Sequence, residues 1–265
     1  MTALAFTSYD AALFRVLLSM TSVRTVLGHD TTALVERSAD QVTWTTVRGG
    51  TAVPVNASAL PVSDYEFDPE VPNYYRVTPD TGVYTDQITP SLNGQVVLKV
   101  LRFAFLNQAI APSDAGDITT ASQGATFPVM NRNLPVAVTL QRSSAAGDLT
   151  VATATQEDRN ALRAALSTGE VVLIQVPAGA GWQLDPGYYS IGDAVETRNG
   201  VAWDRRWFTL PLTAVAAPGP DVIPATATWQ TVVNGYATWN DLIAAQATWQ
   251  DVLTLVGAPS DVYVS

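Results

Sequence analysis

The sequence predicts a mainly β chain with three parts: a β-sandwich over residues 1–89, a second β-sandwich-type α+β domain over 90–217, and a C-terminal arm over 218–265. Three observations lead to this expectation. Short β-branched runs alternate with turn residues through most of the chain, only one long segment has helical periodicity, and the last forty residues contain a ten-residue repeat. At 265 residues the chain is long enough for two ordinary domains.

In the first domain, the strands are expected where apolar and polar residues alternate. Residues 14–20 are apolar and partly alternating, and residues 33–37 and 41–47 alternate and contain β-branched side chains. Two glycines follow at residues 49 and 50, where a turn would bring 52–55 back as a hairpin partner.

Residues 64–77 contain two aromatic segments separated by a Pro-rich loop, and this stretch resembles the E–F corner of fibronectin type III modules. The resemblance implies a sandwich of six or seven short strands. Four aromatic residues lie in this stretch: Tyr65, Phe67, Tyr74 and Tyr75. We expect them to pack in the core rather than to stack on a ligand.

The second domain follows a linker predicted at residues 85–95. Its strands are expected at 96–101, 136–141, 149–153, 171–176, 188–193 and 206–212, with a partner-facing loop at 112–124. The one helix is predicted at 155–168. Thr155 and Asp158 form a capping-box pattern at its start, and Gly169 follows its end.

The C-terminal arm begins after a Pro-Gly-Pro linker and repeats Ala-Thr-Trp at a spacing of ten residues. A continuous helix would scatter the tryptophans, so each unit is predicted to be a separate short helix capped by its Thr. The predicted interface residues are the tryptophans and the aliphatic residue three positions after each: Trp229, Trp239, Trp249, Val232, Leu242 and Val252. The tryptophans should be buried against the chain's own β-domains or against a neighbouring subunit.

Composition argues against several classes of function. The formal net charge is −10 and Lys99 is the only lysine, which disfavours binding to nucleic acid or to an anionic membrane surface. No apolar run approaches the roughly 20 residues of a membrane span. Residues 1–20 lack the features of a signal peptide, so we expect a protein made and used without Sec export of its own.

Candidate catalytic and metal-binding residues are sparse. His29 is the only histidine, lies in a predicted turn, and is expected to be a surface residue. Residues 113–117 resemble only a fragment of a calcium loop, and cysteine ligands are absent because the chain has no cysteine. Glu66, Asp68 and Glu70 alternate with apolar residues and are expected to form the solvated face of a strand. We therefore expect no catalytic, cofactor or metal site and no enzymatic activity.

Four segments give the chain its resemblance to minor tail proteins of actinobacterial siphophages and prophages: residues 64–77, 149–177, 208–221 and 257–262. The resemblance implies a structural virion protein similar to a distal tail protein. Such a protein would form a three- or six-fold homo-oligomeric ring at the tail tip, joining the tail tube to the adsorption apparatus. Its partners would be the tail tube, hub and fibre proteins.

Two alternative functions remain open at this stage. A carbohydrate-binding module contacting host surface glycans would use exposed aromatic residues, with Trp182, Tyr188, Tyr189 and Trp203 as candidates. A cell-wall hydrolase would use a pair of the 24 acidic residues.

Overall fold

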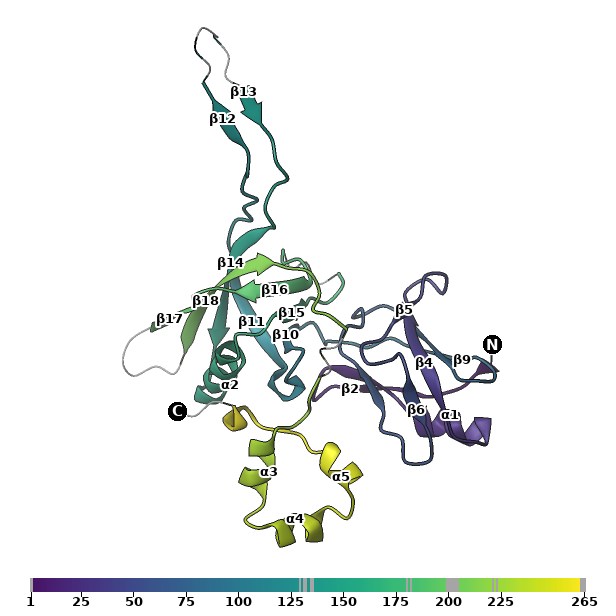
Figure 1. The fold of residues 1–265 in the computed structure, drawn as a ribbon. Helices are drawn as coiled ribbons and strands as arrows, with labels where there is room; N and C mark the ends of the chain where they lie inside the picture. Colours follow the sequence, from purple (N-terminus) through teal and green to yellow (C-terminus); the bar gives the residue numbers. More distant parts are fainter. Residues whose placement is uncertain are drawn as a thin grey trace.

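The computed structural model describes the whole chain except residues 1, 129, 131–132, 134–135, 180, 182, 199–204, 221, 223 and 263–265. It is mainly β, with one long helix in the second module and three short helices near the C-terminus, as the sequence predicts (Figure 1). The first module contains β1 (Thr2–Ala3), β2 (Thr7–Asp10), β3 (Arg15–Leu18), β4 (Thr31–Ser38), β5 (Thr45–Thr46), β6 (Val53–Val55), β7 (Val62–Asp64), β8 (Asn73–Thr78) and β9 (Tyr84–Ile88).

Two sheets form this first module. The larger has the order β1-β9-β8-β4-β5 with β6 also paired to β4, and the smaller has the order β2-β3-β7. Their inner faces share one apolar core, which includes Val16, Val35, Phe67, Tyr75 and Val77. The burial of Phe67 and Tyr75, together with that of Tyr65, agrees with the expectation that these aromatic residues pack in the core.

Several expectations for the first module are wrong. Residues 41–47 form a strand only at β5, and residues 52–55 pair through β6 with β4 rather than with that strand. Residues 20–27 form a helix, α1 (Met20–Leu27), which begins at an N-cap Ser19 and ends at Gly28 with a φ of 84°. The predicted linker at 85–95 begins inside β9, which pairs with β8. Residues 65–70 do not form a strand, so their carboxylates do not line a solvated strand face.

The second module contains β10 (Val96–Val100), β11 (Gln108–Ala115), β14 (Ala146–Thr153), β15 (Val172–Gln175), β16 (Gly187–Ile191), β17 (Val195–Arg198) and β18 (Arg206–Ala214). These strands form a sheet in the order β14-β11-β10-β15-β16-β18-β17, and an additional β14–β18 pairing closes it into a barrel-like sheet. All its ladders are antiparallel.

The long helix of this module, α2 (Gln156–Ser167), has the predicted capping box between Thr155 and Asp158. The apolar face of α2 contributes Leu162, Ala164 and Ala165 to the core of the barrel-like sheet. A short 3-10 helix, η1 (Ala104–Leu106), follows β10 and is also buried.

A β-hairpin, here called the finger (residues 116–145), projects from the second module between β11 and β14 (Figure 1). It carries β12 (Ala125–Phe127) and β13 (Val136–Val138), which pair only with each other. Every residue of these two strands is exposed. The structure thus gives most of the predicted partner-facing loop a defined place, as one side of this projection.

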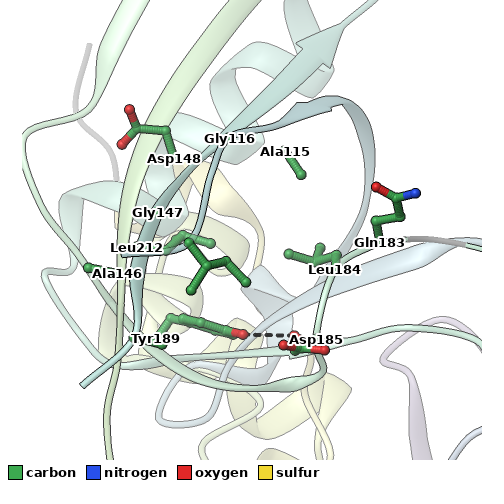
Figure 2. Close-up of a pocket in the computed structure, with 12 residues that line it drawn as sticks. Ala115, Gly116, Ala146, Gly147, Asp148, Gln183, Leu184, Asp185, Tyr189 and Leu212 are labelled. Carbon is green, nitrogen blue, oxygen red and sulfur yellow. Dashed lines mark hydrogen bonds between the residues drawn. The ribbon is translucent and has the colours of Figure 1, made fainter. Parts of the chain in front are cut away.

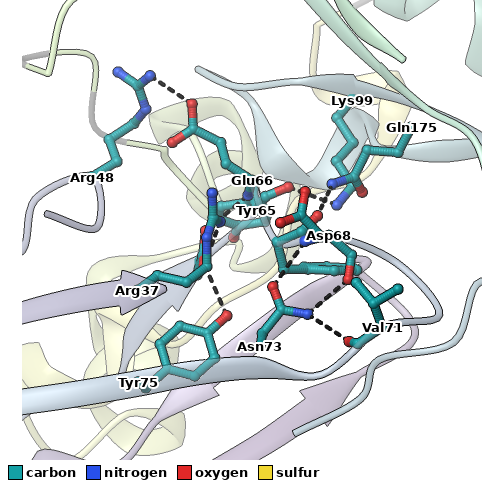
Figure 3. Close-up of polar contacts among 12 residues, drawn as sticks. Arg37, Arg48, Tyr65, Glu66, Asp68, Val71, Asn73, Tyr75, Lys99 and Gln175 are labelled. Atoms are coloured by element: carbon teal, nitrogen blue, oxygen red, sulfur yellow. Dashed lines mark hydrogen bonds and ion pairs between the residues drawn. The ribbon is translucent and has the colours of Figure 1, made fainter. Parts of the chain in front are cut away.

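The two modules share a buried interface (Figure 3). The Lys99 ammonium donates to the Tyr65 carbonyl at 2.8 Å, and the Asn107 amide donates to the Leu13 carbonyl at 3.0 Å. The Gln175 amide likewise donates to the Phe67 carbonyl at 2.5 Å. These polar contacts flank an apolar cluster formed by Leu13, Tyr65, Leu101, Ala104 and Leu173. The interface is therefore packed and hydrogen-bonded rather than a flexible link.

Candidate functional site: the tryptophan arc

The C-terminal repeats form a loop of three short helices, here called the tryptophan arc (residues 225–262). The helices are α3 (Trp229–Gly235), α4 (Trp239–Ala245) and α5 (Trp249–Leu253). Each begins immediately after an N-cap threonine, Thr228, Thr238 or Thr248, and each has a reciprocal capping box with the residue three positions later. The expectation of separate Thr-capped helices is confirmed, because each unit satisfies its own first-turn amides.

The two ends of the arc meet, so it is a closed loop rather than an extended arm (Figure 1). The Ala225 carbonyl accepts from the Ala104 amide at 2.9 Å, which joins the start of the arc to the second module. The Gly257 amide then donates to the Thr226 carbonyl at 2.7 Å, which brings the chain back to where it left. Beyond this point Val262 packs against the core of the second module.

Asp261 fastens this closure. Its carboxylate accepts from the Thr231 hydroxyl at 2.6 Å, the Asn234 amide at 2.7 Å and the Ala258 backbone N–H at 2.9 Å. Burial raises the pKa of Asp261, but the hydrogen bonds from Thr231, Ala258 and Asn234 outweigh that effect and lower it below its ordinary value. The ionised carboxylate therefore links the first helix of the arc to its last turn.

The three tryptophans of the arc are largely exposed. Trp229, Trp239 and Trp249 are 67%, 59% and 66% exposed. Neighbouring rings meet edge to face, with centroids 6.5 Å apart in both pairs. The chain's own β-domains therefore do not cover most of the indole surface. That a neighbouring subunit covers it stays a prediction.

The predicted aliphatic partners are more buried than the tryptophans. Leu242 is buried at 3% exposure, and Val232 and Val252 are half-buried. The next residues along each helix are exposed beside the tryptophans: Val233, Ile243 and Leu253. Residues three and four positions after a Trp both lie near it on the helix surface, and in each unit the fourth is the more exposed of the two. In the sequence, each repeat has two adjacent aliphatic residues, and this pair was the available sign that one of them could be exposed while the other is buried.

Of the four aromatic residues proposed for glycan binding, Tyr188 and Tyr189 belong to the described part of the chain, and they do not share one surface. Trp182 and Trp203 lie outside the described residues. The Tyr188 hydroxyl donates to Glu66 in the module interface. Tyr189 instead lines a pocket at the base of the finger and donates to the Asp185 carbonyl at 2.8 Å (Figure 2). Adjacent residues of a strand point to opposite faces, which separates the two tyrosines.

Two of the three neighbouring carboxylates, Glu66 and Glu70, have structural partners. Glu66 forms an ion pair with Arg48 at 2.8 Å, and Arg48 also donates to the carbonyl of Pro218, which holds the linker before the arc against the first module. Glu70 accepts from the Ser91 hydroxyl and from the Leu92 amide. These contacts give the Glu66 and Glu70 carboxylates structural roles in the fold.

The remaining candidates also have ordinary structural roles. His29 is half exposed and lies 3.1 Å from Asp80, and its hydrogen bond lowers the pKa of the Asp80 carboxyl. Ser113 and Asp114 belong to β11, at a point where its register with β14 shifts, rather than to a calcium-binding loop. Within the described part of the chain, no three His, Cys, Asp or Glu residues gather as metal ligands would.

Comparison with protein-family models gave no match, and neither did comparison with curated proteins. Among the residues that the structure describes, no helix has the length and apolar character needed to span a membrane.

Proposed function

We propose that this chain is a structural assembly protein, and that it builds a ring at the tip of a phage-type tail between the tail tube and the adsorption apparatus. The observation that carries the proposal is the tryptophan arc, which presents three Trp and three aliphatic side chains to solvent. Contiguous exposed apolar surface of this kind is typical of protein–protein interfaces, where Trp is enriched.

The amount of exposed surface suits an interface. Six large apolar side chains, each exposed by about three-fifths to two-thirds, offer on the order of 700 Å². A standard protein–protein interface buries roughly 800 Å² on each partner. The arc alone therefore supplies most of one side of a stable contact.

Two further features support placement in a phage tail. The sequence resembles minor tail proteins of actinobacterial siphophages over the segments given above, two of which, 208–221 and 257–262, adjoin or form the base of the arc. Only 14% of the residues are charged, a low fraction that fits a chain whose surface is largely covered by neighbours. In this proposal the protein resides in the virion after assembly in the host cytoplasm.

Paired substitutions test whether the arc drives assembly. Replacing Trp229 and Trp239 with serine removes exposed rings while leaving the Thr caps in place. The matched control replaces Gln230 and Asn240, the exposed residues after each Trp, with serine. Light scattering after size-exclusion chromatography should show larger assemblies for the parent and the control, and monomers for the tryptophan variant. A parent chain that is monomeric at high concentration, and absent from purified particles by mass spectrometry, would refute the proposal.

A second experiment separates assembly from folding. Because the Gly257 amide already donates to the Thr226 carbonyl, a two-residue Asn-Gly turn can replace residues 227–256. We expect this shortened chain to unfold at a similar temperature and to remain monomeric. If the second module unfolds instead, the arc is a lid of that module rather than a docking surface.

The carbohydrate-binding alternative is tested on the same full-length protein. Saturable binding of cell-surface glycan by a chain that does not oligomerise would favour it. The positions of Tyr188 and Tyr189 on opposite faces of β16 give that alternative little support.

A further inference from the structure

The finger is the second apolar projection of the molecule, and it has no partner within the described chain. Five of its large apolar side chains are 41–62% exposed: Ile118, Phe127, Val136, Val138 and Leu140. Its two strands have three residues each and pair only with each other. A lone two-stranded ribbon is marginally stable in water, so a surface that covers these side chains would stabilise it.

The finger and the tryptophan arc carry opposite formal charge. The finger, residues 116–145, includes two arginines and one aspartate, a formal charge of +1 in a chain whose net charge is −10. The arc, residues 225–262, includes three aspartates and no lysine, arginine or histidine, a formal charge of −3. Complementary charge of this kind selects one partner surface over others and fixes the orientation of docking.

The two projections extend from opposite ends of the second module (Figure 1). The finger leaves the barrel-like sheet beside β14, whereas the arc is attached through Ala225 near η1. A finger therefore cannot reach the arc of its own chain. The arc of a second copy is apolar like the finger and opposite to it in formal charge. Every assembly of this protein would contain that surface.

We propose that the finger of one copy docks on the tryptophan arc of the next copy, with Phe127 and Val138 against the ridge of tryptophans. The contact is heterologous, since two different surfaces meet, and such contacts generate closed rings or open filaments. This inference rests on the proposed assembly function and specifies which surfaces carry it.

The absence of cysteine in the sequence allows a direct test by disulfide trapping. Single variants Val138→Cys and Ile243→Cys of the full chain are mixed and oxidised, and mass spectrometry identifies the products. The mixed 138–243 dimer should form at least tenfold faster than the dimer of Ile243→Cys with Val42→Cys, a site on the first module that is more exposed than Val138. Equal rates for the two pairs would overturn the finger–arc contact.

A charge pair tests the same contact without a covalent link. Val138→Asp and Val138→Lys both remove the apolar side chain from the finger and differ only in the sign of the charge. Beside an acidic arc, Val138→Asp should weaken assembly several-fold more than Val138→Lys in light-scattering titrations. Equal weakening would overturn the pairing with the arc.

The outcomes also separate this inference from the function on which it rests. If the parent chain assembles but the 138–243 dimer is not favoured, the finger–arc contact is wrong while assembly stands. If the parent chain never assembles, both proposals fall.

Discussion

Asp261 controls whether the tryptophan arc stays closed, and its removal should open the arc without unfolding the modules. Asp261→Ala deletes three hydrogen bonds, those from Thr231, Asn234 and the Ala258 amide. Hydrogen bonds to a charged group contribute about 1.5–3 kcal/mol each when well buried, and less where water competes. Since this carboxylate is only partly buried, we assign it a total of about 2 kcal/mol. The closed state should lose that much relative to the open one.

Hydrogen exchange at individual amides measures this opening. A loss of about 2 kcal/mol corresponds to roughly thirty-fold faster exchange at amides protected by the closure, the Gly257 amide above all. Asp251→Ala is the matched control, because Asp251 completes the capping box of α5 but makes no contact at the base of the arc. Unchanged protection of Gly257 in Asp261→Ala would refute the reasoning.

The lowered pKa of Asp261 gives the same closure a pH dependence with a defined sign. A carboxyl whose folded-state pKa is depressed stabilises the closed arc at every pH above its unfolded value of about 3.9. That contribution is lost as the pH falls through the lower folded-state value. Protection of Gly257 should therefore hold from neutral pH to about pH 4 and decline below it, and Asp261→Asn should abolish the decline.

Three further substitutions test other parts of the fold. Gly50→Ala would place a Cβ 2.7 Å from the Val35 carbonyl, so urea unfolding should show a first module destabilised by about 1–3 kcal/mol. Gly124→Ala would place a Cβ 2.6 Å from the Val138 carbonyl and should disorder the finger, seen as faster amide exchange there at an unchanged melting temperature. Burial lowers the pKa of Lys99 well below its ordinary value. Below about pH 10 the unfolded chain therefore binds a proton at Lys99 more readily than the folded chain does, and the free energy of unfolding should rise as the pH rises towards about 10. Lys99→Met should remove that rise, measured by urea unfolding at several pH values.

The sequence was most informative where structure depends on local interactions. The capping boxes of α2 and of the arc helices use residues three positions apart, so Thr155 with Asp158 and the Thr-Trp units could be recognised without tertiary information. The ten-residue period likewise argues against a continuous helix without any tertiary information. These features were predicted correctly because the donors, acceptors and helix starts lie within one turn of chain.

Prediction failed where two local patterns competed. Residues 20–27 include Val23, Thr25 and Val26, whose β-branched side chains favour strands, and they follow an apolar run that does form β3. The cap signals at Ser19 and Gly28 were present, and in the structure they define α1. Burial of Met20 and Val23 in the first core supplies the tertiary packing that outweighs propensity there.

The orientation of the arc could not be read from sequence for a different reason. Val232 and Val233 are both aliphatic and adjacent, so helical periodicity alone cannot say which faces solvent. Closure of the loop through Gly257 and Asp261 decides this, and those contacts span about thirty residues of sequence. The finger poses the same problem, because Thr126 pairs with Ala137 across a turn that carries no strong hairpin signal.

The finger and the arc are both largely independent of the two cores. Every residue of the finger strands is exposed, and the arc helices cap themselves and contribute only Leu242 to the buried residues of the described chain. Surface that folding does not require, yet that is apolar and repeated, is costly in water unless another molecule covers it. Changes to these side chains should therefore alter association while leaving the melting temperature of the modules nearly constant. That separation of assembly from folding makes the docking hypothesis accessible to single substitutions in the intact protein.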